Sequence, residues 1–283
     1  MLFPTNLLGM FFALTSAFVW GGGDFSGGLA TRKSSPYQVL VLSGFAGALG
    51  LVLYLLVWRE ALPSLNSVGW AALAGLAGTV GLASLYRALS LGHTAVVAPT
   101  SGVICASLPV LFSIFTVGLP GLARLSGFGF ALSGIWLVSA SSETNAGRVS
   151  REGLLLACLA GVNFGLFFIL LAQVERGSVF FPLLISRIVE LAAVLLVLAF
   201  SRSPLPSVKD NPIALLAGVL DVGGNVFYLL AKQFTSLDVA AVLASLYPAS
   251  TVMLAGIILK EKVSLRQWAG VMLCLLAIAL ITV

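Results

Sequence analysis

The sequence is poor in charge, and this scarcity excludes several classes of protein. Lysine and arginine together number 15 and aspartate and glutamate 10, so charged residues make up 9% of the 283 residues. Soluble domains carry about 25% charged residues. A disordered protein, a nucleic-acid-binding module and an ordinary soluble enzyme are therefore excluded.

Histidine and cysteine are also scarce. His93 is the single histidine, and the three cysteines, Cys105, Cys158 and Cys274, are odd in number and lie far apart inside apolar runs. A zinc or iron site needs several convergent ligands, and a disulfide framework needs paired cysteines. We expect the cysteines to be packing residues, and we expect no metal and no cofactor.

What the sequence has instead is apolar residues, which make up 59% of it and raise the mean hydropathy to +1.10. A helix needs about 20 apolar residues to cross the hydrocarbon core of a bilayer. The first run stays apolar for too long to be the core of a signal peptide, so it is read as a retained span. Ten suitable runs are present: Leu7–Ala30, Pro36–Trp58, Val68–Leu89, Ala95–Val117, Leu122–Ser139, Gly153–Val174, Phe180–Phe200, Pro212–Ala231, Val239–Leu259 and Leu265–Val283.

An all-α integral membrane protein is predicted, because the runs are continuous and about twice the length of a barrel strand. Short gaps between the runs make neighbouring helices antiparallel. Helix-start signals fall at three of the boundaries. They are Ser35-Pro36 with Gln38, Ser264 with Gln267, and Asn211-Pro212.

The longest polar gap, residues 140–152, divides the ten runs into two sets of five, residues 1–139 and 153–283. Shifting one half by 143 positions superposes the run boundaries and places Gly75 on Gly218 and Gly81 on Gly224. An odd number of spans in each repeat inverts one copy relative to the other, which is the inverted-repeat plan of secondary transporters. Ten spans without internal symmetry remain the alternative.

Basic residues in the gaps bear on orientation. With both termini inside, the cytoplasmic gaps would carry four Lys or Arg and the outer gaps ten, so the positive-inside rule favours both termini outside. The four are Arg59, Arg124, Arg176 and Lys232, and the ten are Arg32, Lys33, Arg87, Arg148, Arg151, Arg202, Lys209, Lys260, Lys262 and Arg266.

The eighth span carries polar residues along one face. Asp221 lies near its middle, and Asn225, Tyr228 and Lys232 follow at helical spacing. A charged group at the bilayer centre costs about 3 kcal/mol, so this face points toward protein or water. Two interpretations stay open: the wall of a cavity that binds substrate, or a structural hydrogen-bond network between helices.

The seventh span carries Arg187 and Glu190, three residues apart and near its middle. They can pair along the helix, or Arg187 can reach Asp221 on the next span. In a binding site, Arg187 would hold a substrate carboxylate, and Glu190 or Asp221 would bind a cationic group or a coupling proton. A purely structural salt bridge is equally open.

Further candidate residues lie in other spans. Trp20 could stack on a substrate, the glycines that follow it allow close helix packing or a helix break, and Asp24 could face a cavity or be hydrated at the end of the span. Asn163 lies in the corresponding region of the second half, and Tyr247 could project its hydroxyl inward. Candidate gating points, where a proline removes a backbone hydrogen bond, are Pro99, Pro109 and Pro248.

One motif points to a different class. The sequence Gly21-Gly22-Gly23-Asp24 matches the Gly-x-Gly-Asp pattern of intramembrane aspartyl proteases, with Asp221 as a candidate second carboxylate. That chemistry needs two carboxylates that share a proton. In such proteases the Gly-Asp motif follows the partner aspartate, whereas here it comes first.

The second half carries a resemblance to a transporter family. The residues concerned are the run Ala-Ala-Val-Leu-Ala-Ser-Leu-Tyr247-Pro248, then Lys260-Glu261-Lys262-Val263-Ser264, Gly270 and Arg187. With ten spans in two sets of five, the chain resembles the EamA-type members of the drug/metabolite transporter superfamily, in their amino-acid and metabolite exporter branch. In the first half, glycines 118, 44 and 78 stand where the second half has Glu261, Arg187 and Asp221, so polar recognition is expected mainly in the second half.

The resemblance implies ten helices around a central cavity, export or exchange of small metabolites, and termini on the cytoplasmic side. That orientation conflicts with the charge count, and both stay open. The resemblance adds no cofactor, and no nucleotide-binding loop is found in the sequence, so a gradient or facilitated movement would drive transport.

The sequence therefore predicts a secondary transporter of the bacterial inner membrane, and not an enzyme. It would export or exchange small polar metabolites, with amino acids as the leading class, by alternating access. Arg187 would meet the carboxylate, Asp221 or Glu190 the amine, and Tyr228, Trp20 and Tyr247 the side chain. Its partners would be the small-molecule substrate and the lipid bilayer, with a proton as a candidate coupling ion, no nucleic acid, and a monomeric state. The alternatives are an intramembrane aspartyl protease and a non-transporting scaffold.

Overall fold

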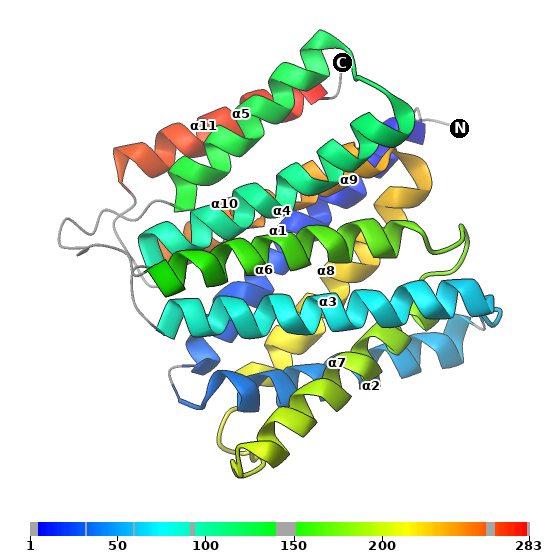
Figure 1. Cartoon of the computed structure of the whole chain (residues 1–283), viewed down its shortest axis with the longest axis vertical. Helices are drawn as coiled ribbons and strands as arrows, with labels where there is room; N and C mark the ends of the chain where they lie inside the picture. The colour runs from blue at the N-terminus through cyan, green and yellow to red at the C-terminus, as the bar shows by residue number, and fades with distance from the viewer. Residues whose placement is uncertain are drawn as a thin grey trace.

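The structure is a computed structural model that describes residues 5–31, 33–58, 60–90, 94–139, 151–258 and 264–281. These residues form eleven α-helices and, within the described part, no strand (Figure 1). The all-α class predicted from the sequence is confirmed. The helices are α1 (Thr5–Thr31), α2 (Pro36–Trp58), α3 (Leu65–Ser90), α4 (Thr94–Val117), α5 (Leu122–Ser139), α6 (Arg151–Ala172), α7 (Phe180–Phe200), α8 (Ile213–Phe234), α9 (Leu237–Ala244), α10 (Tyr247–Ile258) and α11 (Leu265–Ile281).

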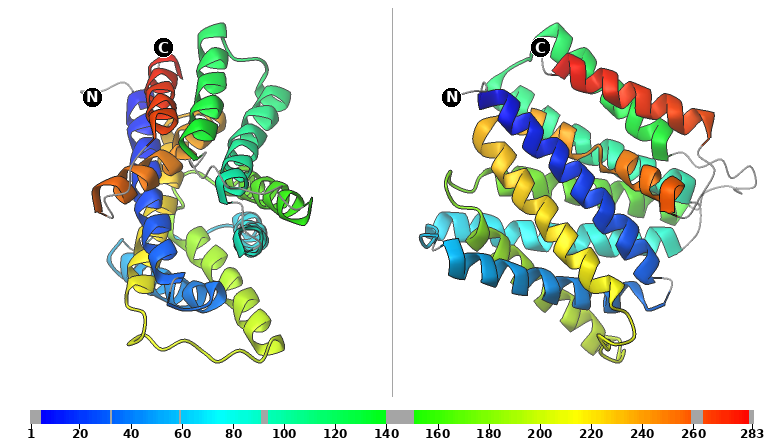
Figure 2. Two further views of the ribbon diagram at one scale, coloured as in Figure 1. Left: turned by 90° about the vertical axis from the view of Figure 1, so that its left-hand side faces the viewer. Right: turned by 180° about the vertical axis from the view of Figure 1, so that it is seen from behind.

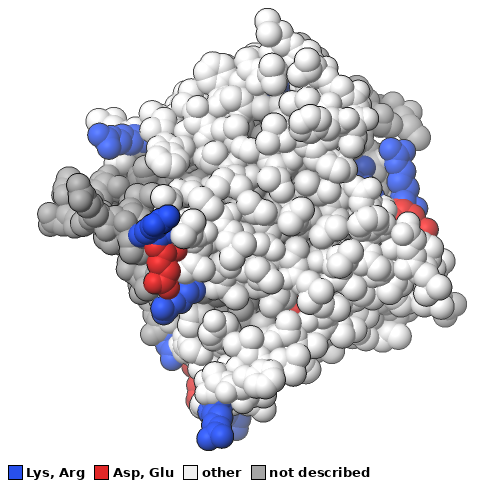
Figure 3. Space-filling view, viewed as in Figure 1, with Lys and Arg blue, Asp and Glu red and all other residues white. Residues whose placement is uncertain are grey.

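The outer surface of the bundle is that of a multi-pass membrane protein. In the described part of the chain, seven helices, α1–α4 and α6–α8, are long and apolar enough to cross a bilayer. Large apolar side chains cover the outside, with Phe115 and Phe200 each 87% exposed. Charged side chains gather at two opposite edges of the face in Figure 3, and the area between them is almost free of charge. A large apolar surface with charged residues only at its edges is suited to contact with the hydrocarbon core of a bilayer.

The ninth predicted span is divided into two helices. α9 ends at Ala244 and α10 begins at Tyr247, with a turn at Ser245 and Leu246 between them. A continuous helix would need the N–H of residue 248 to bond the carbonyl of Ala244, and Pro248 has no N–H. Within the first turn of α10 the same proline is tolerated. All residues of α9 except Leu237 are buried.

Two of the predicted helix starts can be compared with the structure. At α2 the capping box is confirmed: the Ser35 N–H donates to Gln38 Oε1 at 3.1 Å, and the Gln38 N–H donates to Ser35 Oγ at 3.3 Å. At α8 the predicted Asn211 cap is wrong, because the start of this helix has no side-chain cap. The Asn211 side chain instead donates to the Ala30 carbonyl at 2.8 Å and so ties the start of α8 to the end of α1.

The largest helix–helix contacts join a helix of the first half of the chain to a helix of the second half. α1 packs along α8, and α3 packs along α6, while α2 packs on α7 and α5 packs on α11. The view from behind shows α1 and α8 side by side (Figure 2). The shift of 143 positions converts α1 into α6 and α3 into α8. Under this shift the α1–α8 contact corresponds to the α3–α6 contact. The α2–α7 and α5–α11 contacts each correspond to themselves.

Two glycines, one in each half of the chain, make equivalent close contacts with a helix of the other half. A Cβ added at Gly75 of α3 would lie 2.5 Å from the Ser186 carbonyl oxygen in α7. A Cβ added at Gly218 of α8 would likewise overlap the main chain of Ser43 in α2. Gly75 and Gly218 are related by the 143-residue shift, and so are Ser43 and Ser186. Each glycine lets its helix approach the partner backbone more closely than any side chain would permit.

Candidate functional site

A cavity of about 730 Å³ lies inside the bundle, lined by residues of α1–α4, α6–α8 and α10. Its lining reaches one end of the bundle at Thr31, the last residue of α1, and Pro36, the first residue of α2. Toward the other end the lining stops at Leu51 and Leu183, about two turns before the end of α2 and one turn after the start of α7. The volume lies within the range of about 300–1,000 Å³ that is typical of small-molecule sites.

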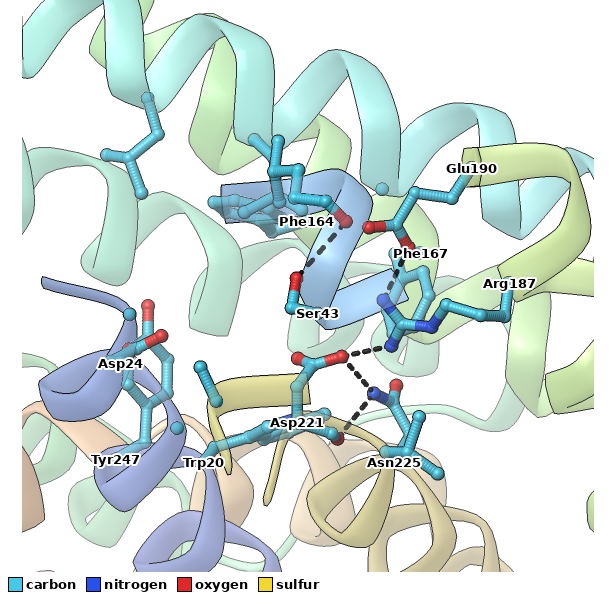
Figure 4. Close-up of a pocket in the computed structure, with 18 of the residues that line it drawn as sticks. Trp20, Asp24, Ser43, Phe164, Phe167, Arg187, Glu190, Asp221, Asn225 and Tyr247 are labelled. Atoms are coloured by element: carbon cyan, nitrogen blue, oxygen red, sulfur yellow. Dashed lines mark hydrogen bonds and ion pairs between the residues drawn. The ribbon is translucent and has the colours of Figure 1, made fainter. Parts of the chain in front are cut away.

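Three charged side chains form an ion triad in this cavity. The Arg187 Nη1 donates to Glu190 Oε2 at 2.9 Å, and its Nη2 donates to Asp221 Oδ2 (Figure 4). Arg187 and Glu190 are buried, with 7% and 8% of their surface exposed, whereas the Asp221 side chain is 42% exposed. Buried charges are stable only when they are paired. The two ion pairs of the triad therefore offset the cost of burying its charges.

Asn225 extends this triad by one turn of α8. Its Nδ2 donates to the Asp221 carbonyl at 2.8 Å and to Asp221 Oδ2 at 3.3 Å. Two other side-chain oxygens of this group lack a hydrogen-bond donor among the described residues. Asn225 Oδ1 and Glu190 Oε1 are buried, and neither accepts a hydrogen bond from any residue that the structure describes.

Trp20 joins α1 to the same turn of α8. The indole Nε1 donates to the Asp221 carbonyl at 3.1 Å, and the ring contacts Phe168, Tyr228 and Tyr247. α1 is unbroken through its glycine run, and a Cβ at Gly23 would lie 3.3 Å from the Asp221 backbone nitrogen. Of the two expected uses of these glycines, the structure therefore shows close helix packing and no helix break.

Asp24 and Tyr247 line the cavity on another side. Figure 4 places their side chains next to each other, away from Arg187. Asp24 is exposed, although it lies within a membrane-spanning helix, because it faces the cavity. The cavity therefore has a second carboxyl group that is not part of the ion triad.

Several predicted site residues lie elsewhere. Tyr228 is fully buried behind the cavity, where its hydroxyl donates to the Phe168 carbonyl at 2.9 Å. Lys232 donates to the Val174 carbonyl, two residues after the end of α6, and Asn163 donates to its own helix at the Leu159 carbonyl at 2.9 Å. Both interpretations of the polar face of α8 therefore apply to parts of it: Asp221 and Asn225 line the cavity, whereas Tyr228 and Lys232 hydrogen-bond to the backbone of residues 168 and 174.

The predicted gating prolines lie in two helices. Pro109 is buried within α4, which runs without a break, and it does not line the cavity. Pro99 also lies in α4 and Pro248 in α10, but their side chains are outside the described part of the structure. Their gating role stays a prediction.

Some cavity residues were missed by the sequence reasoning. Ser43 and Ser186 line the cavity, as do three phenylalanines of α6, Phe164, Phe167 and Phe168. Serines and phenylalanines are common in membrane helices, so composition carries no signal for them. The two serines do share one signal, since they occupy the same position in the two halves of the chain.

Two carboxylates clasp the bundle at the end where the cavity lining stops. Glu60, in the α2–α3 gap, accepts hydrogen bonds from the Val179 and Phe180 N–H groups at 2.5 and 2.7 Å, at the start of α7. Glu175, in the α6–α7 gap, accepts from the Ser64 N–H at 2.9 Å, just before α3. Anions are stabilised at helix N-termini. The carboxylate in each gap therefore binds at the start of the helix that follows the other gap. We name Glu60 and Glu175 the loop clasp.

The arrangement can be compared with a protease dyad. Asp24 and Asp221 both line the cavity, but no hydrogen bond joins their carboxyl groups, and Asp221 is paired with Arg187 instead. Among the described residues there is also no group of three or more His, Cys, Asp or Glu that could hold a metal ion. The geometry is suited to binding a charged solute.

This chain is similar to one protein family over its second half and to a solved structure over most of its length. The EamA-like transporter family model matches residues 151–283. No curated protein sequence matches the chain. A solved structure described as "Crystal structure of protein" is similar to this chain with a TM-score of 0.75 at 17% sequence identity, covering 97% of this chain and 96% of that one. At this identity the likeness shows a shared fold, and it extends over both halves of the chain.

Proposed function

We propose that this multi-pass membrane protein is a secondary transporter that moves small polar metabolites by alternating access. The observation that carries the proposal is the cavity itself. A space of about 730 Å³ holds Arg187, Glu190 and Asp221 inside membrane-spanning helices. Charged residues at such a depth are costly and typically mark a substrate or ion pathway. The match of residues 151–283 to the EamA-like transporter family supports the same function.

Alternating access is supported by the two ends of the cavity. The lining reaches one end at Thr31 and Pro36, while the loop clasp ties the other. We propose that residues 1–139 and 153–283 are inverted repeats joined by the linker 140–152. The corresponding helix contacts and the paired Gly75 and Gly218 approaches support this plan. In a carrier of this type, rocking one repeat against the other closes one end as the other opens.

Amino acids are the substrate class proposed first. The substrate amine would lie against Asp221 and Glu190, and the aromatic rings of Trp20 and Tyr247 would contact its side chain. The role expected for Arg187 changes, because both of its terminal nitrogens already bind carboxylates of the protein. In this proposal Arg187 holds Glu190 and Asp221 in place as their internal counter-charge.

The experiment is counterflow in liposomes containing the purified protein. Vesicles loaded with unlabelled solute should accumulate the radiolabelled form of it faster than protein-free vesicles, for at least one amino acid or organic cation in a panel. Asp221→Asn should abolish this exchange, and Glu152→Gln, which alters an exposed carboxylate of a surface ion pair, should not. Exchange no faster than in protein-free vesicles for every solute would count against a carrier. Cleavage of a membrane-embedded peptide would then support the protease alternative.

Proton coupling through Glu190 or Asp221 is the proposed driving mechanism. The described titratable groups that line the cavity are Asp24, Cys105, Arg187, Glu190, Asp221 and Tyr247. Uptake measured with and without a pH gradient tests the coupling, and an unchanged rate removes the proton from the mechanism. The proposed setting is the bacterial inner membrane, with the monomer as the working unit.

A further inference from the structure

Both terminal nitrogens of Arg187 already donate to carboxylates of the protein. Its Nη1 and Nη2 bind Glu190 and Asp221, and its Nε lies against α2, where a Cβ at Gly47 would be 3.5 Å away. An incoming carboxylate binds arginine best through two parallel N–H donors on one edge. To offer the edge formed by Nη1 and Nη2, Arg187 would have to release a carboxylate of its own and leave it unpaired in a buried site. The structure therefore disfavours a substrate carboxylate at this position.

The triad holds two carboxylates and one guanidinium, so acidic groups outnumber basic groups in it. Glu190 Oε1 and Asn225 Oδ1 are buried and receive no donor from any described residue. Asp221 Oδ1 likewise has no protein donor in the described part of the chain, and its side chain is exposed to the cavity. Three acceptor oxygens without a described donor thus lie around a guanidinium whose two terminal nitrogens already bind carboxylates. A primary ammonium carries three N–H donors and no acceptor, which is the complement of this arrangement.

The rest of the cavity has the same character. Asp24 adds a further carboxyl group on the side of Tyr247, and Arg187 is the single basic residue among the described residues of the lining. Aromatic side chains, Trp20, Phe164, Phe167 and Tyr247 among them, form much of the remaining wall. Aromatic faces attract cations and pack against apolar bodies.

We propose that this cavity recognises its substrate by a cationic amine and not by a carboxylate, so that organic amines without a carboxylate belong to its substrate class. The proposal rests on the transport function above and narrows it. It places the ammonium between Asp221 Oδ1 and Glu190 Oε1, with the apolar part of the solute against the aromatic wall. Amino acids are accepted through their amine, and their carboxylate is dispensable.

Four probes of similar size and shape separate the two groups. Phenylalanine has both the amine and the carboxylate, phenylalaninamide has only the amine, N-acetylphenylalanine has only the carboxylate, and N-acetylphenylalaninamide has neither. Binding is measured as thermal stabilisation of the purified full-length protein. Transport is measured as inhibition of counterflow by each probe, using whichever labelled solute the protein exchanges.

Phenylalaninamide should bind at least as tightly as phenylalanine, and both acetylated probes should bind at least about tenfold more weakly, because the orphaned acceptors then lack a charged donor. Binding of N-acetylphenylalanine equal to that of phenylalaninamide would overturn the proposal, as would no binding of any probe. A protein that exchanges solutes but prefers the carboxylate probe remains a transporter, so that result overturns only this inference. Absence of exchange for every solute rejects the proposed function itself.

Substitutions of the triad carboxylates test where the ammonium group of the substrate binds. Glu190→Gln and Asp221→Asn should each lower the affinity for phenylalaninamide by about tenfold or more, whereas the surface change Glu152→Gln should leave it unchanged. If the triad variants fail to fold, Asp24→Asn provides a second test, since Asp24 is exposed to the cavity and makes no part of the triad. It should weaken phenylalaninamide more than N-acetylphenylalanine. Equal weakening of both probes would contradict selection by charge.

Discussion

Arg187 of α7 reaches Asp221 of α8 across the cavity, although each of these helices packs mainly against other helices. α7 lies on α2 and α3, and α8 lies on α1 and α2. The ion pair is therefore a side-chain connection between two helices that share little backbone contact. A change in this pair alters both the stability of the bundle and the shape of the cavity, and the first prediction separates these two effects.

Arg187→Met should lower the free energy of unfolding by about 3–5 kcal/mol, because it leaves Glu190 and Asp221 uncompensated in a buried site. Denaturation of the purified protein in detergent measures the change. The matched control is Arg87→Met, which breaks the exposed pair between Arg87 and Glu152 and should cost less than about 1 kcal/mol. Equal stability of the two variants would show that the triad is not buried as described.

The triple variant Arg187→Met, Glu190→Met, Asp221→Leu should recover most of the stability lost in Arg187→Met, because no charge is left without a partner. It should show no counterflow. Stability without exchange would assign the triad to transport, whereas a triple variant that still exchanges solute would refute that role.

Gly75→Ala and Gly218→Ala should destabilise the protein to a similar extent, by about 1–3 kcal/mol each, because a methyl group would overlap the facing backbone of Ser186 or Ser43. Gly50→Ala is the control, since a Cβ at that position in α2 meets no atom within 4 Å. The melting temperatures of the three variants provide the measurement. A large effect at one of the two glycines and none at the other would contradict the equivalence of the two halves.

Weakening the loop clasp should open the end of the cavity that it ties. Hydrogen bonds to a charged acceptor are worth about 1.5–3 kcal/mol, so Glu60→Gln should raise the open population roughly tenfold. The reporter is Leu183→Cys in a protein whose native cysteines are replaced by alanine, labelled by an impermeant maleimide from the clasp side. Glu152→Gln, at the opposite end, should leave the labelling rate unchanged. Identical rates for Glu60→Gln and the parent would mean that the clasp does not control access.

The positive-inside rule predicts which end faces the cytoplasm. The helix ends and gaps at the end that the cavity lining reaches carry Lys33, Arg87, Arg151, Arg202, Lys209 and Arg266, and those at the other end carry Arg124, Arg176 and Lys232. Thr31→Cys should therefore react with an impermeant reagent only after bacterial cells are permeabilised, and Leu119→Cys should react in intact cells. The reverse pattern would place the termini in the cytoplasm, as the family resemblance implies.

The spans could be predicted from the sequence because the cost of placing polar groups in lipid acts on each segment separately. Nine of the ten predicted runs coincide with single helices to within a few residues. The ninth run was taken as continuous because hydropathy does not register a missing N–H, although Pro248 stood in the sequence at the point that interrupts it. The pairing of Arg187 with Glu190 and Asp221 was expected because unpaired charge in lipid is too costly to persist.

What could not be predicted depends on which helices are neighbours. Tyr228 follows Asp221 on the same face of α8, but that face leaves the cavity within two turns and enters a contact with α6. The loop clasp joins two gaps that are more than a hundred residues apart, and neither Glu60 nor Glu175 stands in a recognisable motif. Side-chain periodicity gives the direction of a residue from its own helix axis and contains no information about what lies there.

Among the residues that the structure describes, those of the shortest helix are the most completely buried. α9 has eight residues, and it contacts α1, α4, α5, α6 and α8. Isolated helices of this length are not stable in water, so its hydrogen bonds persist only while the surrounding helices enclose it. The amide hydrogens of residues 241–244 should therefore exchange with deuterium only when the whole assembly opens. Their protection factors would then measure the global opening free energy of the protein in its bilayer.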